Sequence, residues 1–254
     1  MLPYFYYPTC TVGFLTFQTW GFFVTLGILV AIFIATKSAK KKNIETKHVW
    51  DAVFWVIIAA FIGARFGHVF FYNWVYFSQN LWDIPKIWLG GFSSYGGFAG
   101  AAIAAILYIK KYKLNFSIFS DILVVGLPLG WAIGRIGCFL IHDHPGKISN
   151  FILGVNYPDG IRHDLGLYDS LNALILAIVI FIFHKTFEKK PGLILAVVSL
   201  WYGSVRFFLD FLRATDGNFS DPRYFGLTPG QYGSILLFGL GIVLLFRVSR
   251  TLKS

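Results

Sequence analysis

Charged residues are scarce in this chain. Asp, Glu, Lys and Arg make up only 13% of its 254 residues, whereas 56% are hydrophobic and the mean hydropathy is +0.65. A soluble domain of this length must cover its surface with polar side chains, and this composition does not provide them. The scarcity of charge therefore excludes a soluble globular fold and predicts a membrane protein.

Cysteine is also rare, and a signal-peptide pattern is missing. Cys10 and Cys138 are the two cysteines. A disulfide between them is chemically permitted outside the cytoplasm, but two residues do not establish a pairing. The opening sequence MLPYFYYPTC has neither a basic leader nor a small-residue cleavage site. We therefore expect the first apolar stretch to remain in the mature protein.

Seven apolar stretches approach the roughly 20 residues that a helix needs to cross about 30 Å of hydrocarbon. They lie at 14–36, 52–72, 90–109, 119–141, 168–184, 192–213 and 231–248. Pro128 and Gly130 predict a kink in the fourth stretch. The sequence thus predicts an all-α polytopic membrane protein with seven transmembrane helices, which form one membrane domain over residues 1–254.

The net charge of +10 comes from 22 Lys and Arg against 12 Asp and Glu. Fourteen of the basic residues lie in alternate connections between the spans: Lys37, Lys40, Lys41, Lys42, Lys47, Lys110, Lys111, Lys113, Lys185, Lys189, Lys190, Arg247, Arg250 and Lys253. The positive-inside rule places these connections in the cytoplasm, the N-terminus outside and the C-terminus inside. This placement accounts for the positive charge without nucleic acid binding.

The other eight basic residues fall on the predicted outward side: Arg65, Lys86, Arg135, Lys147, Arg162, Arg206, Arg213 and Arg223. An arginine inside the hydrocarbon region is unfavourable and marks a functional site by default. Arg65, Arg135 and Arg206 are expected at a similar depth, roughly 10 Å below the outer end of their helices. Three guanidiniums at one level predict an anion site.

The sixth stretch carries a polar face. Tyr202, Arg206, Asp210 and Arg213 follow one another at i, i+4, i+8 and i+11, which puts them on one side of a helix. Phosphate suits this wall because guanidinium binds it with paired hydrogen bonds and stays charged, and a phospholipid headgroup is the abundant phosphate of a bilayer. The structural alternative is that Arg206 pairs with Asp210 and that Arg213 lies among headgroups.

Two outward segments depart from regular helix. Residues 90–97 contain four glycines, which predicts irregular backbone beside a cavity, and the Trp-rich connection 74–89 is expected along the membrane surface. Residues 142–167 predict a small outward cap, with a strand at 150–157 followed by a turn at 158–160.

The polar residues that open the cap could transfer protons. They are His142, Asp143, His144 and, later, His163. Their spacing matches no common zinc motif and no cysteine accompanies them in the cap, so no metal is predicted. Histidine titrates near neutral pH, which favours proton transfer, although a loop histidine is often merely exposed to solvent.

Six sequence blocks together resemble those of one enzyme family. The blocks GARFGHVFFYN, WLGGFSSYGG, GRIGCFLIHDHPGK, RHDLGLYD, YGSVRFFLDFLR and GQYGS, in this order between about Gly63 and Ser234, are similar to those of bacterial prolipoprotein diacylglyceryl transferases. The resemblance implies an enzyme without cofactor or metal in the bacterial cytoplasmic (inner) membrane. Such an enzyme transfers the diacylglyceryl group of phosphatidylglycerol to the lipobox cysteine of a preprolipoprotein at the outer face, and releases glycerol phosphate.

The resemblance also implies the site residues. Catalytic candidates are Arg135, Arg206, Asp143, Tyr95, His142 and His144. Substrate-binding candidates are Arg65, Asn73, Gly96, Gly97, Gly134, Gly137, Cys138, Gly146, Tyr202, Asp210 and Arg213. Arg135 and Arg206 match the arginines that engage the phosphate in this family.

The chain departs from the family pattern at several positions. Tyr95 replaces a histidine that is a proposed base, Cys138 replaces an asparagine, Trp20 replaces a tyrosine, and Asp143 and Asp210 replace glutamates. A phenol with a pKa near 10 is a poor base at pH 7. The thiol proton is then accepted by His142, His144 or Asp143, or the thiolate forms without a dedicated base.

Two alternative functions stay open from the sequence. One is the same fold with a different acceptor or lipid substrate, and the other is a non-enzymatic phospholipid or anion transporter. Transporters often contain internal repeats with paired broken helices, and no convincing repeat is visible in this chain.

Overall fold

The structure, a computed structural model, describes residues 1–86, 88, 90–216 and 223–251. Lys253 of the basic tail and Leu89 of the Trp-rich connection lie outside the described residues. In chain order, the elements are β1 Thr9–Val12, β2 Leu15–Gln18, α1 Thr19–Lys41, α2 Thr46–Phe71, α3 Trp74–Gln79, the 3₁₀ helix η1 Leu81–Asp83, α4 Ser94–Lys111, α5 Phe116–Val124, α6 Leu127–Ile141, β3 Pro145–Ile148, β4 Val155–Tyr157, β5 Gly160–Asp164, α7 Leu165–Ile182, α8 His184–Glu188, α9 Leu193–Leu209, the 3₁₀ helix η3 Asp210–Leu212, and α10 Pro229–Thr251.

The long helices agree with the predicted class of an all-α polytopic membrane protein. Six segments among the described residues are long and apolar enough to cross a membrane: Thr19–Lys41, Thr46–Phe71, Phe116–Ile141, Leu165–Ile182, Leu193–Leu212 and Pro229–Arg250. The third predicted stretch, 90–109, also contains a helix, the 18-residue α4, but this helix is not among the six.

The first helix begins later than predicted. The predicted stretch started at residue 14, but β1 and β2 pair as an antiparallel hairpin up to Gln18. Gly13 at the hairpin turn has φ +63°, a backbone conformation that suits glycine, and the residues on either side are largely β-branched or aromatic. Trp20 consequently lies in the first turn of α1 and not a third of the way along it.

Regular helix is interrupted within the fourth predicted stretch, between Val124 and Leu127, and the predicted kink stays a prediction. α5 ends at Val124, and α6 begins at Leu127 with Pro128 in its first turn, where the missing N–H of proline has no effect. The irregular backbone predicted for 90–97 is confined to the residues before α4. Gly90 and Gly91 have positive φ angles, and α4 starts at Ser94.

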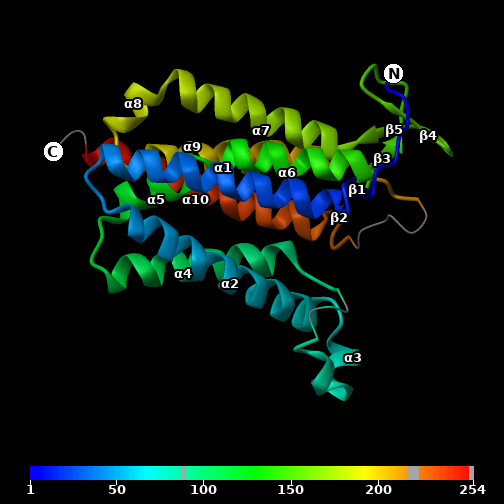
Figure 1. The fold of residues 1–254 in the computed structure, drawn as a ribbon, viewed down its shortest axis with the longest axis horizontal. Coiled ribbons are helices and arrows are strands. Elements are labelled where there is room, and N and C mark those ends of the chain that lie inside the picture. The colour runs from blue at the N-terminus through cyan, green and yellow to red at the C-terminus, as the bar shows by residue number, and fades with distance from the viewer. Residues whose placement is uncertain (87, 89, 217–222, 252–254) are drawn as a thin grey trace.

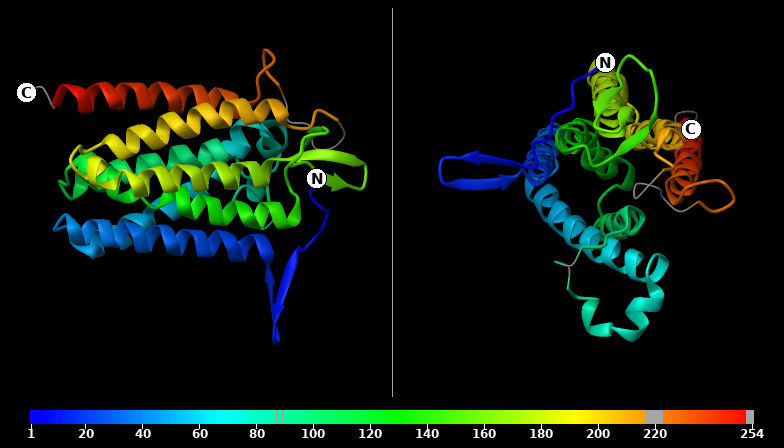
Figure 2. Two further views of the ribbon diagram at one scale, coloured as in Figure 1. Left: turned by 90° about the horizontal axis from the view of Figure 1, so that it is seen from above. Right: turned by 90° about the vertical axis from the view of Figure 1, so that its right-hand side faces the viewer.

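Glycines bring several helices into close contact. α2 packs along α4, α1 along α6, and α9 along α10 (Figure 2). A Cβ atom added to Gly63 of α2 would lie 2.3 Å from the carbonyl oxygen of Gly96 in α4, and one added to Gly130 of α6 would lie 2.5 Å from that of Gly27 in α1. Small residues that let backbones approach drive helix association in membranes.

The two ends of the helices differ in polarity. Figure 1 places the sheets at one end and α8 and the C-terminus at the other. The largest buried apolar cluster joins α1, α2, α4 and α5 at the α8 end, and consists of Ala35, Ala39, Val49, Ala52, Tyr108, Ile109, Phe119 and Ile122. The buried charged residues of the sheet end include Arg162, Asp164, Asp169 and Asp210. The polar chemistry of the chain is therefore concentrated at the sheet end.

A three-stranded antiparallel sheet, ordered β3-β5-β4, connects α6 to α7. The predicted strand 150–157 is wrong in extent, because only Val155–Tyr157 forms β4. Leu2 pairs with Val155 of β4 in a parallel bridge, and the Leu2 N–H donates to the carbonyl of Gly154. The N-terminal segment is thus attached to this sheet.

We expect Gly63→Ala to destabilise the protein and Gly239→Ala to stabilise it. The new Cβ at Gly63 meets backbone that cannot move aside, and overpacking of this kind typically costs about 1–3 kcal/mol. Gly239 in α10 has no atom within 4 Å of an added Cβ, so there alanine contributes its higher helix propensity, about 1 kcal/mol. Thermal unfolding of the two variants in detergent checks this. Midpoints that shift in the same direction would contradict the packing argument.

Candidate active site

A carboxylate from α7 joins two arginines from neighbouring helices at the sheet end. Asp169 Oδ2 lies 3.0 Å from Arg135 Nε in α6 and 3.6 Å from Arg206 Nη1 in α9. The Asp169 side chain is 1% exposed, so it pairs with both guanidiniums away from water. A single buried carboxylate thus connects three helices.

A second carboxylate extends this cluster. Asp210 Oδ1 lies 3.0 Å from Arg206 Nη2 and 3.5 Å from Arg213 Nε, and the Thr228 hydroxyl donates to Asp210 Oδ2. The pairing of Arg206 with Asp210 is the structural alternative raised by the sequence, and it is present here alongside the pairing with Asp169. The predicted polar face of Tyr202, Arg206, Asp210 and Arg213 is therefore a connected set of charges.

Positive groups outnumber negative groups in this arrangement. We call the five residues Arg135, Asp169, Arg206, Asp210 and Arg213 the arginine cluster; it contains three guanidiniums and two carboxylates. The carboxylate side chains are 1% exposed, whereas those of the arginines are 12–17% exposed. The carboxylates therefore lie behind the arginines, whose remaining N–H groups are more accessible. Such a cluster suits an anion that accepts several hydrogen bonds.

Aromatic rings line the cluster. The guanidinium of Arg135 lies over the Trp131 ring, 4.9 Å from its centroid, and Tyr202 packs edge-on against Trp131 at 5.6 Å. Tyr95 reaches from α4 to α10, where a Cβ atom at Gly233 would overlap its ring. This wall combines apolar surface with few polar groups, as lipid and small-molecule sites commonly do.

Cys138, Asp143 and His144 lie beside Arg135. Arg135 Nη1 donates to Cys138 Sγ at 3.6 Å, and Asp143 Oδ1 is hydrogen-bonded to His144 Nδ1. Burial lowers the pKa of His144, and the nearby charges of Arg135 and Arg213 act in the same direction, while Asp143 opposes them. The imidazole is therefore neutral at pH 7 and able to accept a proton.

His142 has a different environment from His144. Its Nδ1 lies 2.6 Å from Asp164 Oδ2, to which the Tyr157 hydroxyl also donates at 2.8 Å. Its ring is buried and stacks on Tyr4 at 4.8 Å. Asp164 in turn caps α7 through the N–H of Leu167. These contacts give His142 a structural place between the N-terminal segment and the sheet, which leaves His144 as the more accessible histidine.

Arg65 does not join the arginine cluster. It is 5% exposed, and its five N–H groups are directed to backbone carbonyls of the connection before α4. The acceptors are the carbonyls of Asp83, Ile84, Lys86, Gly90 and Gly91. A guanidinium has five donors, so these bonds leave none for a phosphate. The structure therefore groups Arg135 and Arg206 with Arg213 and not with Arg65. Binding of an anion by this group stays a prediction.

The remaining candidates lie mostly at helix contacts. Asn73 is exposed between α2 and α3. A Cβ atom added at Gly96 or Gly97 would meet α2, and one added at Gly134 or Gly137 would meet α1. A Cβ atom added at Gly146 would meet the Leu212 carbonyl and His163. Both cysteines are free, with Cys10 exposed and Cys138 buried.

Sequence reasoning missed Asp169, Trp131 and Thr228 as site residues. Only Asp169 carried a detectable signal, because an acidic residue within an apolar span needs a buried partner. Trp131 lies one helical turn before Arg135, but its contact with Tyr202 and the hydrogen bond of Thr228 to Asp210 join segments that are separate in the sequence.

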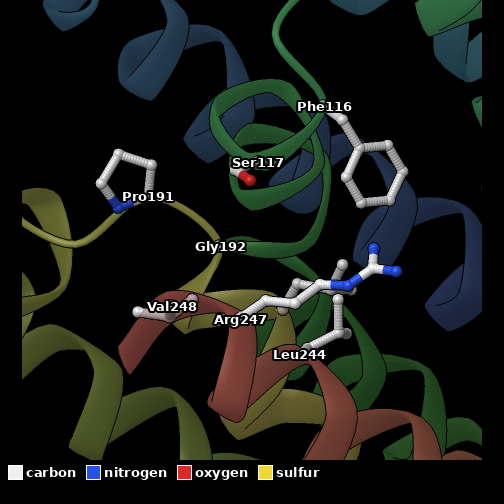
Figure 3. Close-up of a pocket in the computed structure, with 8 residues that line it drawn as sticks. Phe116, Ser117, Pro191, Gly192, Leu244, Arg247 and Val248 are labelled. Atoms are coloured by element: carbon white, nitrogen blue, oxygen red, sulfur yellow. The ribbon is translucent and has the colours of Figure 1, made fainter. Parts of the chain in front are cut away.

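A pocket at the opposite end of α9 is a different kind of feature. Figure 3 shows Arg247 extending from α10 towards the start of α5. The pocket is lined by Phe116, Ser117, Pro191, Gly192, Leu195, Leu244, Arg247 and Val248. None of these lining side chains is a carboxylate, imidazole or thiol.

Comparison with known proteins identifies relatives of this chain. A family model for prolipoprotein diacylglyceryl transferase matches residues 9–247. The chain is 33% identical to a phosphatidylglycerol–prolipoprotein diacylglyceryl transferase of Finegoldia magna over 89% of this chain and 88% of the relative. It is 32% identical to one of Streptococcus agalactiae over 87% and 88%, and 30% identical to one of Nitrosomonas europaea over 93% and 87% of the two chains.

We expect Asp169→Asn to lower the free energy of unfolding by about 3–5 kcal/mol, the typical cost of removing one partner from a buried ion pair. The variant keeps the shape of the side chain but leaves two guanidiniums without their shared countercharge. Asp159→Asn is the matched control: Asp159 pairs with Arg162 at 2.7 Å but is 55% exposed, so its loss should lower the free energy of unfolding far less. Denaturation in detergent measures both. Equal losses would show that burial does not govern the Asp169 pairs.

Proposed function

This chain belongs to the prolipoprotein diacylglyceryl transferase family, and we propose that it transfers the diacylglyceryl group of phosphatidylglycerol to the lipobox cysteine of a preprolipoprotein, with release of glycerol phosphate. The observation that carries the proposal is the arginine cluster, in which three guanidiniums face two buried carboxylates among apolar helices. The similarity to transferases does not favour the alternatives of a transporter or a different acceptor.

We propose seven transmembrane helices, with α4 as the seventh beside the six longer segments. Basic residues at the ends of α1 and α4 and in the connection after α7 support cytoplasmic placement of the α8 end. The sheet end then faces outward from the bacterial cytoplasmic membrane. Residues 142–167, with their three strands, form an outward cap over the arginine cluster.

The phosphate of the lipid binds to the arginine cluster. Arg135 and Arg206 are held from behind by Asp169, so their orientation is fixed before substrate arrives. Preorganised donors of this kind stabilise charge that develops in a transition state without further rearrangement. The cluster sets three guanidiniums against two carboxylates, and this excess of positive groups suits an anionic phosphodiester and the greater charge of the departing phosphate.

The reaction is a displacement at the glyceryl carbon that bears the phosphate. The thiolate of the lipobox cysteine forms a carbon–sulfur bond, the carbon–oxygen bond to phosphate breaks, and glycerol phosphate leaves with the bonding electrons. His144 accepts the thiol proton, since it is neutral and oriented by Asp143. Tyr95 packs against α10 and contributes to the wall of the cavity.

We expect Arg135→Ala to reduce transfer by about a hundredfold to a thousandfold, the usual loss when one preorganised charge donor is removed. Arg223→Ala, at an exposed arginine that donates to the carbonyl of Gly226, should retain activity. The assay combines purified protein, phosphatidylglycerol and a lipobox peptide, and follows the peptide mass and the released glycerol phosphate. Glycerol phosphate without modified peptide would indicate another acceptor, and near-normal activity of Arg135→Ala would refute the assignment.

We also expect His144→Gln to lower the rate by about 10²–10⁴-fold, the range for loss of a general base. His184→Gln, at a partly exposed histidine whose Nδ1 lies 2.8 Å from the carbonyl of Phe181, serves as the control and should leave the rate unchanged. The same peptide assay measures both variants after their insertion and thermal stability have been compared with the parent. A fully active His144→Gln protein would exclude His144 as the proton acceptor.

A further inference from the structure

Cys138, Asp143 and His144 form a group of metal-ligating side chains that their sequence spacing does not suggest. One sulfur, one carboxylate oxygen and one imidazole nitrogen from these residues all lie within 4.8 Å of one another. Cys138 belongs to the last turns of α6, whereas Asp143 and His144 follow the helix. The helix end therefore brings a thiol to the two polar residues of the cap.

The backbone conformation of His142 brings Asp143 and His144 close to Cys138. His142 has φ +49°, the left-handed conformation that commonly ends a helix, and this reverses the chain after α6. The N–H of Asp143 then lies 3.4 Å from the carbonyl oxygen of Cys138. His142 is fixed in turn by its contact with Asp164. The three ligand side chains are thus gathered by a buried and well-connected turn.

The donor set suits a borderline-soft cation. Zn²⁺ binds thiolate, imidazole and carboxylate at about 2.0–2.3 Å, so two ligands of a tetrahedral ion are about 3.5 Å apart. Atoms at the present limit of 4.8 Å must approach by about 1 Å, and the hydrogen bond between Asp143 and His144 must open so that both can bind the ion. Asp143 and His144 are 31% and 24% exposed and have room to move, whereas Cys138 is 5% exposed and fixes the position.

The surrounding charges permit a cation. Arg135 donates to Cys138 Sγ and opposes a positive ion, and Arg213 lies close enough to affect His144. Asp169 lies 3.0 Å from Arg135 and offsets part of its charge, since it also pairs with Arg206. Two anionic ligands, from Cys138 and Asp143, balance the charge of a divalent ion.

We propose that Cys138, Asp143 and His144 bind one Zn²⁺ ion reversibly, with a fourth position open to water or an anion. Binding replaces the thiol proton of Cys138, which is released to solvent as the sulfur–zinc bond forms. If His144 accepts the thiol proton during transfer, as proposed above, an ion bound to its imidazole takes the place of that proton and blocks the reaction. Zinc then acts as an inhibitor of the enzyme and not as its cofactor.

Binding is tested without substrate, so the result is independent of the transfer reaction. The purified chain is titrated with Zn²⁺ against a chromophoric chelator and with Co²⁺, whose bond to thiolate gives a charge-transfer absorption band. We expect one ion per chain, a cobalt–thiolate band, and no effect of Mg²⁺, which prefers oxygen ligands.

Two matched cysteine variants decide whether the site is the one proposed. Cys138→Ser should abolish the cobalt–thiolate band and weaken Zn²⁺ binding on the order of 100-fold, by comparison with the 10–100-fold effects of residues that only support a metal ligand. Cys10→Ser, at the exposed cysteine of β1, should bind as the parent does. Unchanged binding by Cys138→Ser, loss of binding by Cys10→Ser, or no stoichiometric binding by the parent would each overturn the proposal.

Discussion

The ion pairs of Asp169 with Arg135 and Arg206 are the interaction on which the sheet end of this protein depends. A guanidinium in an apolar region is unfavourable unless a countercharge compensates it, and a shared carboxylate compensates two. Asp169 comes from α7 and its partners come from α6 and α9. The position of each arginine is consequently determined by the packing of three helices, and so is the geometry of any anion bound between them.

Glycine residues allow the backbones of these helices to approach closely enough for the ion pairs to form. Gly166 lies three residues before Asp169, and a Cβ atom there would be 2.9 Å from the backbone nitrogen of Phe139 in α6. Gly203 lies three residues before Arg206, and its Cβ atom would meet the backbone of α10 at the same distance. Each approach occurs about one helical turn from a charged member of the cluster. The small residues and the charges therefore work together, because short ion pairs across helices need backbones that lie close to one another.

At the sheet end, the neighbouring histidines His142 and His144 have different roles. His142 has the left-handed backbone conformation that ends α6, and Asp164 and Tyr4 enclose its ring. His144, two residues later, is more exposed and lies beside Asp143 and Cys138. His142 thus fixes the turn, and His144 stays partly exposed beside Asp143 and Cys138. The proposed proton transfer and the proposed zinc site therefore both depend on one turn of the backbone.

The sequence by itself determined the membrane class, the seven apolar stretches and the polar face that begins in α9, and it singled out Arg135 and Arg206 as candidates, because hydropathy and charge are local properties of a chain. It also contained the blocks whose resemblance the family match confirms. Only the tertiary structure decided that Arg65 uses its five N–H groups on backbone carbonyls, that Asp169 joins two arginines, and that Cys138 meets His144. The physical reason is that hydrogen bonds and ion pairs act over about 3 Å, and residues far apart in sequence come within that distance only when the helices pack.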